Sequence, residues 1–350
     1  MLVKSITLKN FRNHSYLSYD FQPGMNIITG PNAAGKTNVA EAIYYLSIAK
    51  SFRTEDDEDL VQRTKDKAEI DAVCTEGGIN RKIKITITRE GRNFLINGKP
   101  ATRSELARCA NVLLFEPKDV LLFRGSPKNR RVFLDVNLCK KSQPYLDYLS
   151  RYNKVLKERN DLLKSDKVDP VLLDATTEML AKLSGPIVSY RQMYVKDIND
   201  ILIKITRALT GEEGKLEIIY KPFIEYDKDF QKKALDAFKR AEERDLHQKA
   251  TSIGIHREDF SICLNGRDIG QFGSQGENRI VAIALKLSPY FLIEDKDKRP
   301  VVVLDDVMSE LDKAHGIRLI KFLQKLEQVF ITATSLKVEG AAQYQIKPKE

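Results

Sequence analysis

The N-terminal third of the chain alternates short apolar runs with one amphipathic run, a pattern typical of a mixed α/β domain. Residues 5–11 alternate apolar and polar positions, as a half-buried strand does, and the apolar run 25–30 ends in glycine. Residues 38–50 have the spacing of a helix that buries one face. The pair Asn97-Gly98 predicts a tight hairpin turn, because both residues tolerate positive φ angles.

Between about residues 120 and 250 the pattern changes to long helical stretches rich in Lys, Glu, Leu and Asp. Residues 145–164 and 231–250 are two such stretches. They predict an antiparallel helical arm or lobe, interrupted at prolines and at the glycine-containing loop 210–214. The prolines expected to interrupt it are Pro170, Pro186 and Pro222.

Strand patterns return after the helical block. A second hairpin turn is predicted at Asn265-Gly266, and helical spacing covers 276–293. The runs 301–306 and 329–334 are apolar almost throughout, which is typical of parallel strands buried on both faces. The helical block therefore interrupts an α/β domain whose first and last parts must meet in space.

Residues 30–37 read GPNAAGKT and match the phosphate-binding motif GxxxxGK[ST] in full, between a predicted strand and a predicted helix. Gly30 and Gly35 allow close approach of the backbone to phosphate groups, and the N–H groups at the helix start point at them. We expect Lys36 to reach the β- and γ-phosphates of ATP, and the Thr37 hydroxyl to bind Mg²⁺. The predicted nucleotide-binding residues of this loop are Gly30, Pro31, Asn32, Ala33, Ala34, Gly35, Lys36, Thr37 and Asn38.

A phosphate-binding loop needs an acidic partner at the end of a neighbouring strand, and the run VVVLDD ends in two aspartates. We expect Asp305 to be a metal ligand with Thr37, holding Mg²⁺ through its water shell. Asp306 stands where ABC-type ATPases carry the carboxylate that polarises the attacking water. Most of those ATPases have Glu there, so the shorter Asp predicts slow hydrolysis. The predicted catalytic residues are therefore Lys36, Asp305 and Asp306.

The spacing of these motifs narrows the class of ATPase. Lys36 and Asp305 are 269 positions apart, which is too far for a small GTPase or a nucleoside kinase, and no NKxD guanine motif is present. A large insertion between the two motifs is typical of the ABC-type ATPases of chromosome biology.

Residues 272–279, FGSQGENR, place a Ser-x-Gly turn directly before a predicted helix, which is an anion-binding arrangement. In ABC-type ATPases such a loop binds the γ-phosphate held by the other subunit, so that two heads sandwich two ATP molecules. We therefore predict that Ser274, Gln275 and Gly276 bind nucleotide across an ATP-dependent homodimer.

Together these motifs predict an α/β fold, an ABC-type P-loop ATPase head with a mainly helical second lobe or short arm. We expect residues 1–119 and 272–350 to form the ATPase lobe, since the P-loop and the acidic strand lie there. Residues 120–271 are expected to form the helical lobe or arm that leads to the signature loop.

The chain resembles the RecF family in seven stretches that follow the family's order, so the resemblance covers nearly the whole chain. The stretches are LKNFRN, GPNAAGKTNVAEAIYYLS, SFRT, LLFEPKDVLLFRGSPKNRRVFLD, IGIHREDF, FGSQGENR and VVVLDDVMSELD. The resemblance implies a two-lobed head related to SMC-type ATPases but with a short arm. It also implies a weak, DNA-stimulated ATPase that dimerises on ATP, binds double-stranded or gapped DNA, and releases it after hydrolysis.

In the RecF family this switch serves recombination. The resemblance implies a mediator that works with RecR and RecO to load RecA at single-strand gaps, in DNA repair and replication restart. Arg12 and Asn13 match positions that contact the nucleotide in related heads.

Some residues depart from the family pattern or have open roles. Glu277 stands where Gln is usual and puts an extra negative charge near a phosphate site. Glu116 and Lys118 replace a more typical Ser and Glu, so the sensor of the γ-phosphate in this loop is left open between Glu116 and Asp119. His256 is expected either to face a ligand or to complete a hydrogen bond in the core, and the structural role is favoured.

The composition and the N-terminal residues indicate the cellular compartment of the protein. With 42% apolar residues the chain can build a sizeable core, yet no run approaches the roughly 18 apolar residues that span a bilayer. The N-terminus lacks the apolar block of a signal peptide. The four cysteines are far apart, without zinc-ligand spacing, which fits a reducing compartment. We therefore expect a cytoplasmic protein with no membrane partner.

The net charge of +9 suits a polyanionic partner, because Lys and Arg release counterions when they meet phosphates, although a lysine excess also occurs in proteins in which it serves solubility alone. Lys128, Arg130 and Arg131 form a dense basic cluster and are the predicted DNA contacts. Basic character continues along the arm at Lys154, Lys157 and Arg159. No recognition helix or aromatic stacking surface is evident, so we expect phosphate contacts, insensitivity to sequence and strong salt dependence.

Three other functions share parts of this pattern. The ATP-binding subunit of an ABC transporter would carry a fuller LSGGQ-type signature. The ATPase head of another SMC-like DNA tether would carry hundreds of heptad residues and a hinge or a CxxC hook. A nuclease of the overcoming-lysogenization type would need a further metal-binding domain, for which no residues remain.

Overall fold

The computed structural model describes residues 1–347 apart from 121, 123, 124, 212 and 213. The chain divides into two compact units. The first unit comprises Met1–Asp119, Ile205–Glu212 and Arg279–Glu350, and the second comprises Val120–Lys204 and Glu213–Asn278. The first unit thus resumes at Arg279, whereas the sequence pattern put the return of the ATPase lobe at residue 272. Among the described residues, no helix is both long enough and apolar enough to cross a membrane.

A five-stranded parallel sheet forms the centre of the first unit, in the order β14-β3-β13-β12-β8. Its strands are β3 (Gly24–Thr29), β8 (Val112–Phe115), β12 (Val301–Asp305), β13 (Gln328–Ala333) and β14 (Ala342–Gln345). Every residue of β12 and β13 is buried, so the apolar runs are central strands, as predicted. Because parallel strands end at the same edge, the loop after β3 and the aspartates after β12 lie at one edge of the sheet.

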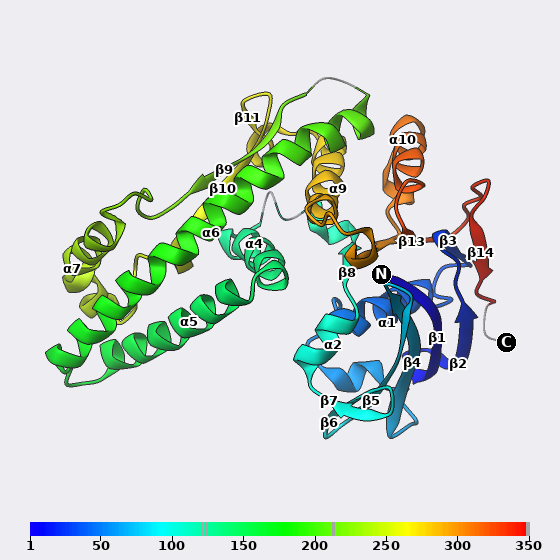
Figure 1. Cartoon of the computed structure of the whole chain (residues 1–350), viewed down its shortest axis with the longest axis horizontal. Coiled ribbons are helices and arrows are strands. Elements are labelled where there is room, and N and C mark those ends of the chain that lie inside the picture. The colour runs from blue at the N-terminus through cyan, green and yellow to red at the C-terminus, as the bar shows by residue number, and fades with distance from the viewer. Residues whose placement is uncertain (121, 123–124, 212–213, 348–350) are drawn as a thin grey trace. The chain divides into compact units, whose positions relative to one another are not determined.

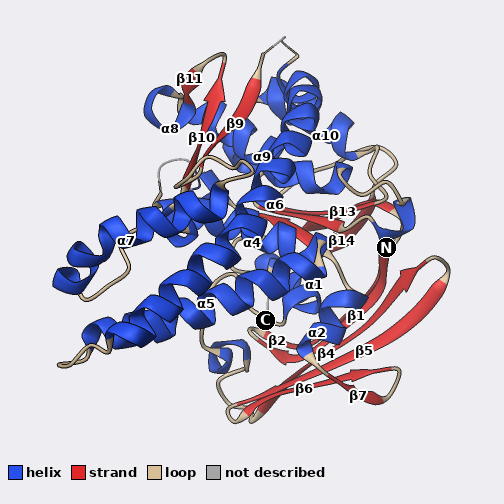
Figure 2. Ribbon diagram, turned by 60° about the vertical axis from the view of Figure 1, so that its left-hand side comes forward, coloured by secondary structure: helices blue, strands red, loops and turns tan. Residues whose placement is uncertain are grey.

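A six-stranded antiparallel sheet, in the order β2-β1-β4-β5-β6-β7, completes the first unit (Figure 2). Its strands are β1 (Leu2–Phe11), β2 (His14–Asp20), β4 (Lys67–Glu76), β5 (Ile79–Thr88), β6 (Gly91–Ile96) and β7 (Lys99–Ala101). Helix α1 (Lys36–Ile48) contacts both sheets and α2 (Arg103–Cys109), so it separates the two layers of strands. The hairpin turn predicted at Asn97-Gly98 is confirmed, since both residues have positive φ between paired strands.

A buried glutamine connects the two sheets. The side chain of Gln328, at the start of β13, accepts the N–H of Val3 at 2.7 Å and donates to the carbonyl oxygen of Val3 at 2.9 Å. The register of β1 with β4 shifts at this point, between Val3 and Ser5. Gln328 therefore pairs with the backbone of Val3 as a neighbouring strand would, which fixes the start of β1 relative to the parallel sheet.

The second unit is mainly helical, as the sequence predicts, with a small antiparallel sheet (Figure 1). Its elements are α4 (Pro127–Lys141), α5 (Gln143–Lys164), α7 (Phe230–Gln248), α8 (Ile269–Phe272), β9 (Leu216–Lys221), β10 (Asp259–Leu264) and β11 (Arg267–Asp268). Two helices, α6 (Pro170–Thr210) and α9 (Gln275–Phe291), begin in the second unit and end in the first.

The first unit also contains α10 (Lys313–Leu323). Short 3₁₀ turns cover Asp57–Leu60, Pro117–Val120, Ile255–Arg257, Lys296–Lys298 and Met308–Glu310. The turn predicted at Asn265-Gly266 joins β10 to β11, with positive φ at both residues.

The predicted interruption at Pro186 is wrong, because α6 continues through it. A proline inside a helix removes one hydrogen bond to the carbonyl four residues earlier, here that of Lys182. Lys182 lies on the exposed side of α6, so water can replace the missing donor. The predicted boundaries at Pro170 and Pro222 are correct, since α6 begins at Pro170 and Pro222 follows β9. The predicted loop 210–214 lies partly outside the described residues.

A buried ion pair holds the helices of the second unit together. Arg159 of α5 donates to Asp245 of α7 at 2.8 Å and to Thr177 of α6 at 3.0 Å. Both charged side chains are fully buried. Arg159 is therefore not part of the basic surface along the arm, and that expectation is corrected. The basic pattern of α5 missed this because a charged residue on the core face looks the same in sequence as one on the solvent face.

Candidate nucleotide-binding site

The loop after β3 is packed too tightly to accept side chains at its glycines. A Cβ atom at Gly35 would lie 2.5 Å from Oδ1 of Asn13 and 2.5 Å from Nε2 of His14, and one at Gly30 would lie 2.7 Å from the carbonyl oxygen of Ile346. Gly35 also has a φ of 103°, which side-chain-bearing residues rarely adopt. The loop is therefore a backbone cradle whose shape depends on glycine, as phosphate binding requires.

Lys36 is oriented by the loop that it follows. Its ammonium donates to the carbonyl oxygens of Gly30 and Pro31, both at 2.9 Å, and the residue is 8% exposed. An ammonium has three N–H donors. Two of these donors bind the loop, and the third has no partner among the residues that the structure describes. It can therefore donate to an anion. The donor set therefore fits a phosphate group.

Asp305 receives two hydroxyl groups on one oxygen. Its Oδ1 accepts hydrogen bonds from Thr37 at 3.0 Å and from Thr332 at 2.6 Å, and the residue is 5% exposed. Burial raises the pKa of Asp305 above its usual range. A threonine hydroxyl and one carboxylate are hard oxygen donors that suit Mg²⁺, which keeps water and phosphate among its ligands. The residues at this edge of the sheet therefore fit the predicted metal.

Asp306 follows directly and has an unusual backbone. Its φ is 50°, a left-handed conformation that Asp and Asn tolerate better than most residues. Its N–H donates to Thr332 Oγ1 at 3.0 Å, and its carbonyl oxygen accepts from Ser309 at 2.9 Å. Asp306 is exposed, in contrast to Asp305. The two predicted acidic residues are thus adjacent but differ in burial.

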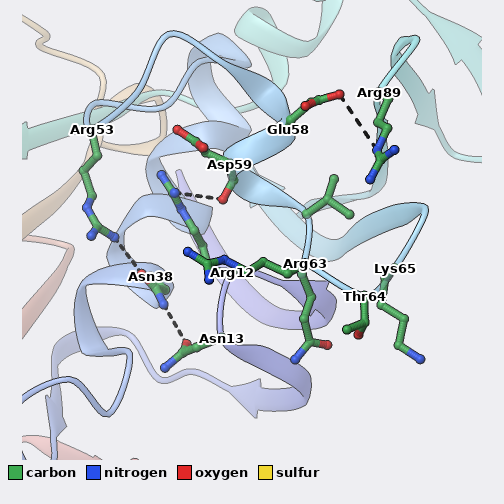
Figure 3. Close-up of a pocket in the computed structure, with 12 residues that line it drawn as sticks. Arg12, Asn13, Asn38, Arg53, Glu58, Asp59, Arg63, Thr64, Lys65 and Arg89 are labelled. Atoms are coloured by element: carbon green, nitrogen blue, oxygen red, sulfur yellow. Dashed lines mark hydrogen bonds and ion pairs between the residues drawn. The ribbon is translucent and has the colours of Figure 1, made fainter.

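A pocket of about 750 Å³ lies beside the start of α1, and Arg12, Asn13, Asn38 and Arg53 line one side of it (Figure 3). Three of these side chains, those of Arg53, Asn38 and Asn13, form a chain of hydrogen bonds. Arg53 donates to Asn38 at 2.7 Å, Asn38 donates to Asn13 at 2.6 Å, and Asn13 donates to the carbonyl oxygen of Ala33 at 3.3 Å. The structure thus brings the predicted residues Arg12, Asn13 and Asn38 together next to the phosphate-binding loop.

The loop after β8 carries an unusual carboxyl group. Phe115 pairs with Leu304 in the parallel sheet, so Glu116 comes next to Asp305 in the register. Burial, followed by the nearby charge of Asp119, raises the pKa of Glu116 to about 7. Asp119 accepts the N–H of Glu116 at 2.8 Å and pairs with Lys286 of α9 at 2.8 Å. Both candidate sensors therefore belong to the first unit.

The signature loop lies in the second unit and forms a reciprocal helix cap. Glu277 accepts the N–H of Ser274 at 2.8 Å, and the Ser274 hydroxyl accepts the N–H of Glu277 at 3.2 Å. These bonds lower the pKa of Glu277. Gln275 and Gly276 begin α9 and are exposed. A carboxylate therefore occupies the end of the helix at which a phosphate was predicted to bind.

The predicted DNA contacts divide into one exposed and two engaged side chains. Lys128 is exposed at the start of α4. Arg130 makes two hydrogen bonds to Asp259, at 2.6 and 2.8 Å, and Arg131 donates to the carbonyl oxygen of Glu258 at 2.7 Å. Both arginines therefore stabilise the second unit, whatever else they contact.

His256 has a structural role. Its two ring nitrogens lie 3.0 Å from the Tyr152 hydroxyl and 3.0 Å from the carbonyl oxygen of Thr251. Burial lowers its pKa to about 4, so it is neutral at physiological pH. The favoured expectation, a hydrogen bond in the core, is met.

Sequence reasoning missed several residues at the site. Glu41 is fully buried in α1 and pairs with Arg12 at 2.7 Å. Arg53 and Ser51 belong to the SFRT stretch, whose residues show no chemical pattern of their own. Thr332 lies within an apolar strand. The one signal available was Glu41 itself, a carboxylate on the apolar face of a helix, because such groups are rarely buried without a partner.

The chain is similar to known proteins over nearly its whole length. A family model described as "RecF/RecN/SMC N terminal domain" matches residues 2–347. The chain is 34% identical over 343 residues to the DNA replication and repair protein RecF of Lachnoclostridium phytofermentans, covering 96% of this chain and 94% of that protein. It is 36% identical to RecF of Streptococcus agalactiae, covering 99% of this chain and 95% of that protein.

Solved structures give the same result. A structure of the recombination mediator protein RecF-ATP in the RecFOR pathway matches with a TM-score of 0.87 and 32% identity, covering 99% of this chain and 97% of that one. An SMC head domain from Pyrococcus furiosus matches with a TM-score of 0.57 and 18% identity, covering 95% and 89%, and shares the fold alone. The predicted fold class is confirmed. The chain therefore belongs to the RecF family.

Proposed function

We propose that this protein is an ATP-dependent, DNA-binding recombination mediator in which ATP drives two heads to dimerise. The observation that carries the proposal is the joint geometry of Lys36, Thr37 and Asp305 around a glycine cradle, in a chain of the RecF family. A similar structure is described as RecF-ATP in the RecFOR pathway, which supports ATP as the ligand.

Each side chain at the site has a specific role in this proposal. The free N–H of Lys36 and the backbone N–H groups of the loop bind the β- and γ-phosphates. Thr37 and Asp305 hold Mg²⁺, which neutralises phosphate charge when bound. Arg12 and Asn13 face the nucleotide from the wall of the pocket.

Hydrolysis depends on Asp306. Its carboxylate accepts a proton from the attacking water while the water oxygen bonds to the γ-phosphorus and the bond to ADP breaks. Asp is one methylene shorter than Glu, so proton transfer is slow. A slow step suits a timer that holds a closed state and then releases it.

The second half of the site comes from a second copy of the chain. Ser274, Gln275 and Gly276 of one protomer contact the ATP held by Lys36 of the other, so ATP stabilises the closed dimer through its higher affinity for that state. Closure creates a basic surface that clamps double-stranded or gapped DNA, and hydrolysis opens it. With RecR and RecO, the clamp supports the loading of RecA at gaps.

The test is to measure the size of the protein with and without ATP, and again with short duplex DNA. The wild-type chain should be a monomer alone and a dimer with ATP. Ser274→Arg should keep ATP binding by the monomer and lose ATP-dependent dimerisation. A wild-type chain that stays monomeric in saturating ATP, with unchanged affinity for duplex DNA, contradicts the proposal.

A further inference from the structure

Glu41 is a fully buried carboxylate in the middle of α1, and two arginines converge on it. Arg12 donates to its two oxygens, from Nε at 2.9 Å and from Nη2 at 2.7 Å. Arg53 approaches the same carboxylate at 3.6 Å, and Ser51 donates its hydroxyl hydrogen to it. Glu41 is therefore the common partner of side chains from two other segments of the first unit, one at Arg12 and one at Ser51 and Arg53.

The packing of α1 does not require a charge at this position. Taking a carboxylate out of water is costly, and apolar residues of similar size commonly stabilise a core at least as well as a buried ion pair. The neighbours Ala40 and Ala42 are fully buried apolar residues. Helix packing alone therefore does not explain a carboxylate at this position, and its arginine partners point to a role at the pocket.

Both arginines line the pocket beside the phosphate-binding loop (Figure 3). The guanidinium of Arg12 is held at a third point, because it also donates to the carbonyl oxygen of Asp59 at 2.8 Å. Arg53 is held between Glu41 and Asn38, and its side chain is 39% exposed. Arg53 therefore retains N–H donors for a ligand in the pocket.

Glu41 also fixes the backbone that carries Arg53. The Ser51 oxygen, whose hydrogen is directed to Glu41, accepts the N–H groups of Arg53 at 2.9 Å and of Thr54 at 3.1 Å. The Glu41 carboxylate thus orients the side chain of Arg12. Through Ser51 it also fixes the turn that carries Arg53.

We propose that Glu41 is a positioning residue for nucleotide binding. It does not touch the nucleotide, and it holds Arg12 and Arg53 at the pocket wall in the orientation that binds it. The proposal rests on the proposed binding of ATP. Five basic and two acidic residues line the pocket, so a net positive charge faces it, which favours an anionic ligand. The basic residues are Arg12, Arg53, Arg63, Lys65 and Arg89, and the acidic ones are Glu58 and Asp59.

The test is a mutant cycle read out as the dissociation constant for ATP with Mg²⁺. Glu41→Gln keeps the shape but removes the charge, and we expect affinity to fall by about 10- to 100-fold, as for other residues that orient binding groups. Glu41→Asp keeps the charge and should lie between Glu41→Gln and wild type. In a background of Arg12→Ala with Arg53→Ala, Glu41→Gln should have little further effect, because the side chains it orients are gone.

Two controls separate positioning from folding. Glu69→Gln removes a carboxylate of the first unit that is partly buried and pairs with Lys67 at 3.0 Å, and it should leave ATP affinity unchanged. If Glu41→Gln does not fold, Ser51→Ala tests the same arrangement from a surface loop and should weaken ATP binding by several-fold.

The outcomes are distinguishable. If wild type does not bind ATP, the proposed function fails and this inference fails with it. If wild type binds ATP and Glu41→Gln binds equally well, the inference alone is overturned. An equal loss from Glu41→Gln with and without the two arginines also overturns it, since the carboxylate would then act through the fold.

Discussion

Thr37 donates its hydroxyl hydrogen to Asp305 over 3.0 Å, although 268 positions separate the two residues in sequence. The contact crosses one intervening strand, because β13 lies between β3 and β12 in the parallel sheet. Thr332 of β13 fills that gap and donates to the same carboxylate oxygen. The sheet thus brings together the oxygen donors of the proposed metal site. The loss of stability that comes from burying the Asp305 carboxylate there can be measured.

Asp305→Asn should separate stability from function. Burial raises the pKa of Asp305, so the fold disfavours the ionised form, and at neutral pH the charge costs stability. Asn keeps an oxygen that accepts from Thr37 and Thr332. We expect the melting temperature without nucleotide to equal or exceed that of wild type, and the stabilisation by ATP with Mg²⁺ to disappear. Thermal melts of both proteins, with and without ligand, test this. An unchanged shift with ligand would contradict the metal assignment.

Asp306→Asn should retain ATP binding and lose hydrolysis. Asn suits the left-handed backbone at this position, so the fold should be preserved. Loss of a proton acceptor typically lowers rates by about 10²- to 10⁴-fold. Single-turnover hydrolysis checks the rate, and a filter-binding assay checks that ATP stays bound. Asp306→Glu is the matched variant, with a longer carboxylate but a poorer fit to positive φ. Fast hydrolysis by Asp306→Asn would remove Asp306 from the mechanism.

Glu116 should make the stability of the nucleotide-free protein depend on pH. Its pKa is about 7 in the fold, against 4.5 for a fully solvated glutamate, so between these values the folded state binds more protons than the unfolded state. Stability therefore falls as pH rises from 5 to 7, by about 2 kcal/mol. Glu116→Gln should remove this fall, so the two proteins should diverge in melting temperature as pH rises to 8. If the melting temperatures of the two proteins change with pH in the same way, the pKa of Glu116 is not raised.

Sequence reasoning located the elements of the site but not the contacts between them. The motif GPNAAGKT has one local structure wherever it occurs between a strand and a helix, so Lys36 and Thr37 could be predicted from residues near them. The aspartates of VVVLDD could be predicted because apolar strands in parallel sheets end at a common edge. Glu41 could only be noticed as an oddity, since its partners come from distant segments.

The basic residues show the same limit. Lys128 and Arg130 are equivalent in a charge pattern, yet one is exposed and the other pairs with Asp259, 129 positions away. Arg159 looked like surface charge and is fully buried in the helical unit. Burial of a charge depends on a partner that sequence proximity does not reveal. The predicted break at Pro186 was wrong for a different reason. The local rule that proline ends a helix did not hold, because water can bond to the exposed carbonyl region at Lys182.

Lys128→Ala should weaken binding to duplex DNA without unfolding the protein. The side chain is exposed, and loss of one phosphate contact should lower the slope of log K against log salt concentration by about 1. Arg130→Ala should instead lower the melting temperature, because it breaks the pair with Asp259. Titrations of labelled duplex at several salt concentrations measure the slope, with Lys321→Ala on α10 as an exposed control. A slope for Lys128→Ala equal to that of the control would exclude Lys128 as a contact.

Glu277→Gln should strengthen the ATP-dependent dimer. The hydrogen bonds to Ser274 lower the pKa of Glu277, so its carboxylate is charged at neutral pH. In the proposed dimer that charge faces the triphosphate of the partner, and like charges repel. Gln retains an oxygen that accepts the N–H of Ser274, so the helix cap is kept while the repulsion is removed. We expect the dimer dissociation constant in saturating ATP to fall by about 10-fold, a gain that misfolding cannot produce.

Sedimentation equilibrium with ATP measures this constant. Raising the salt concentration should reduce the difference in dissociation constant between Glu277→Gln and wild type, because salt screens exposed charges. Glu277→Ala removes both the charge and the acceptor of the Ser274 N–H, so it should dimerise less tightly than Glu277→Gln while sharing its salt response. That difference separates the electrostatic effect from the capping effect. Should Glu277→Gln dimerise no more tightly than wild type at low salt, the carboxylate does not face the partner's phosphates, and the helix start at Ser274 cannot be the second half of the site.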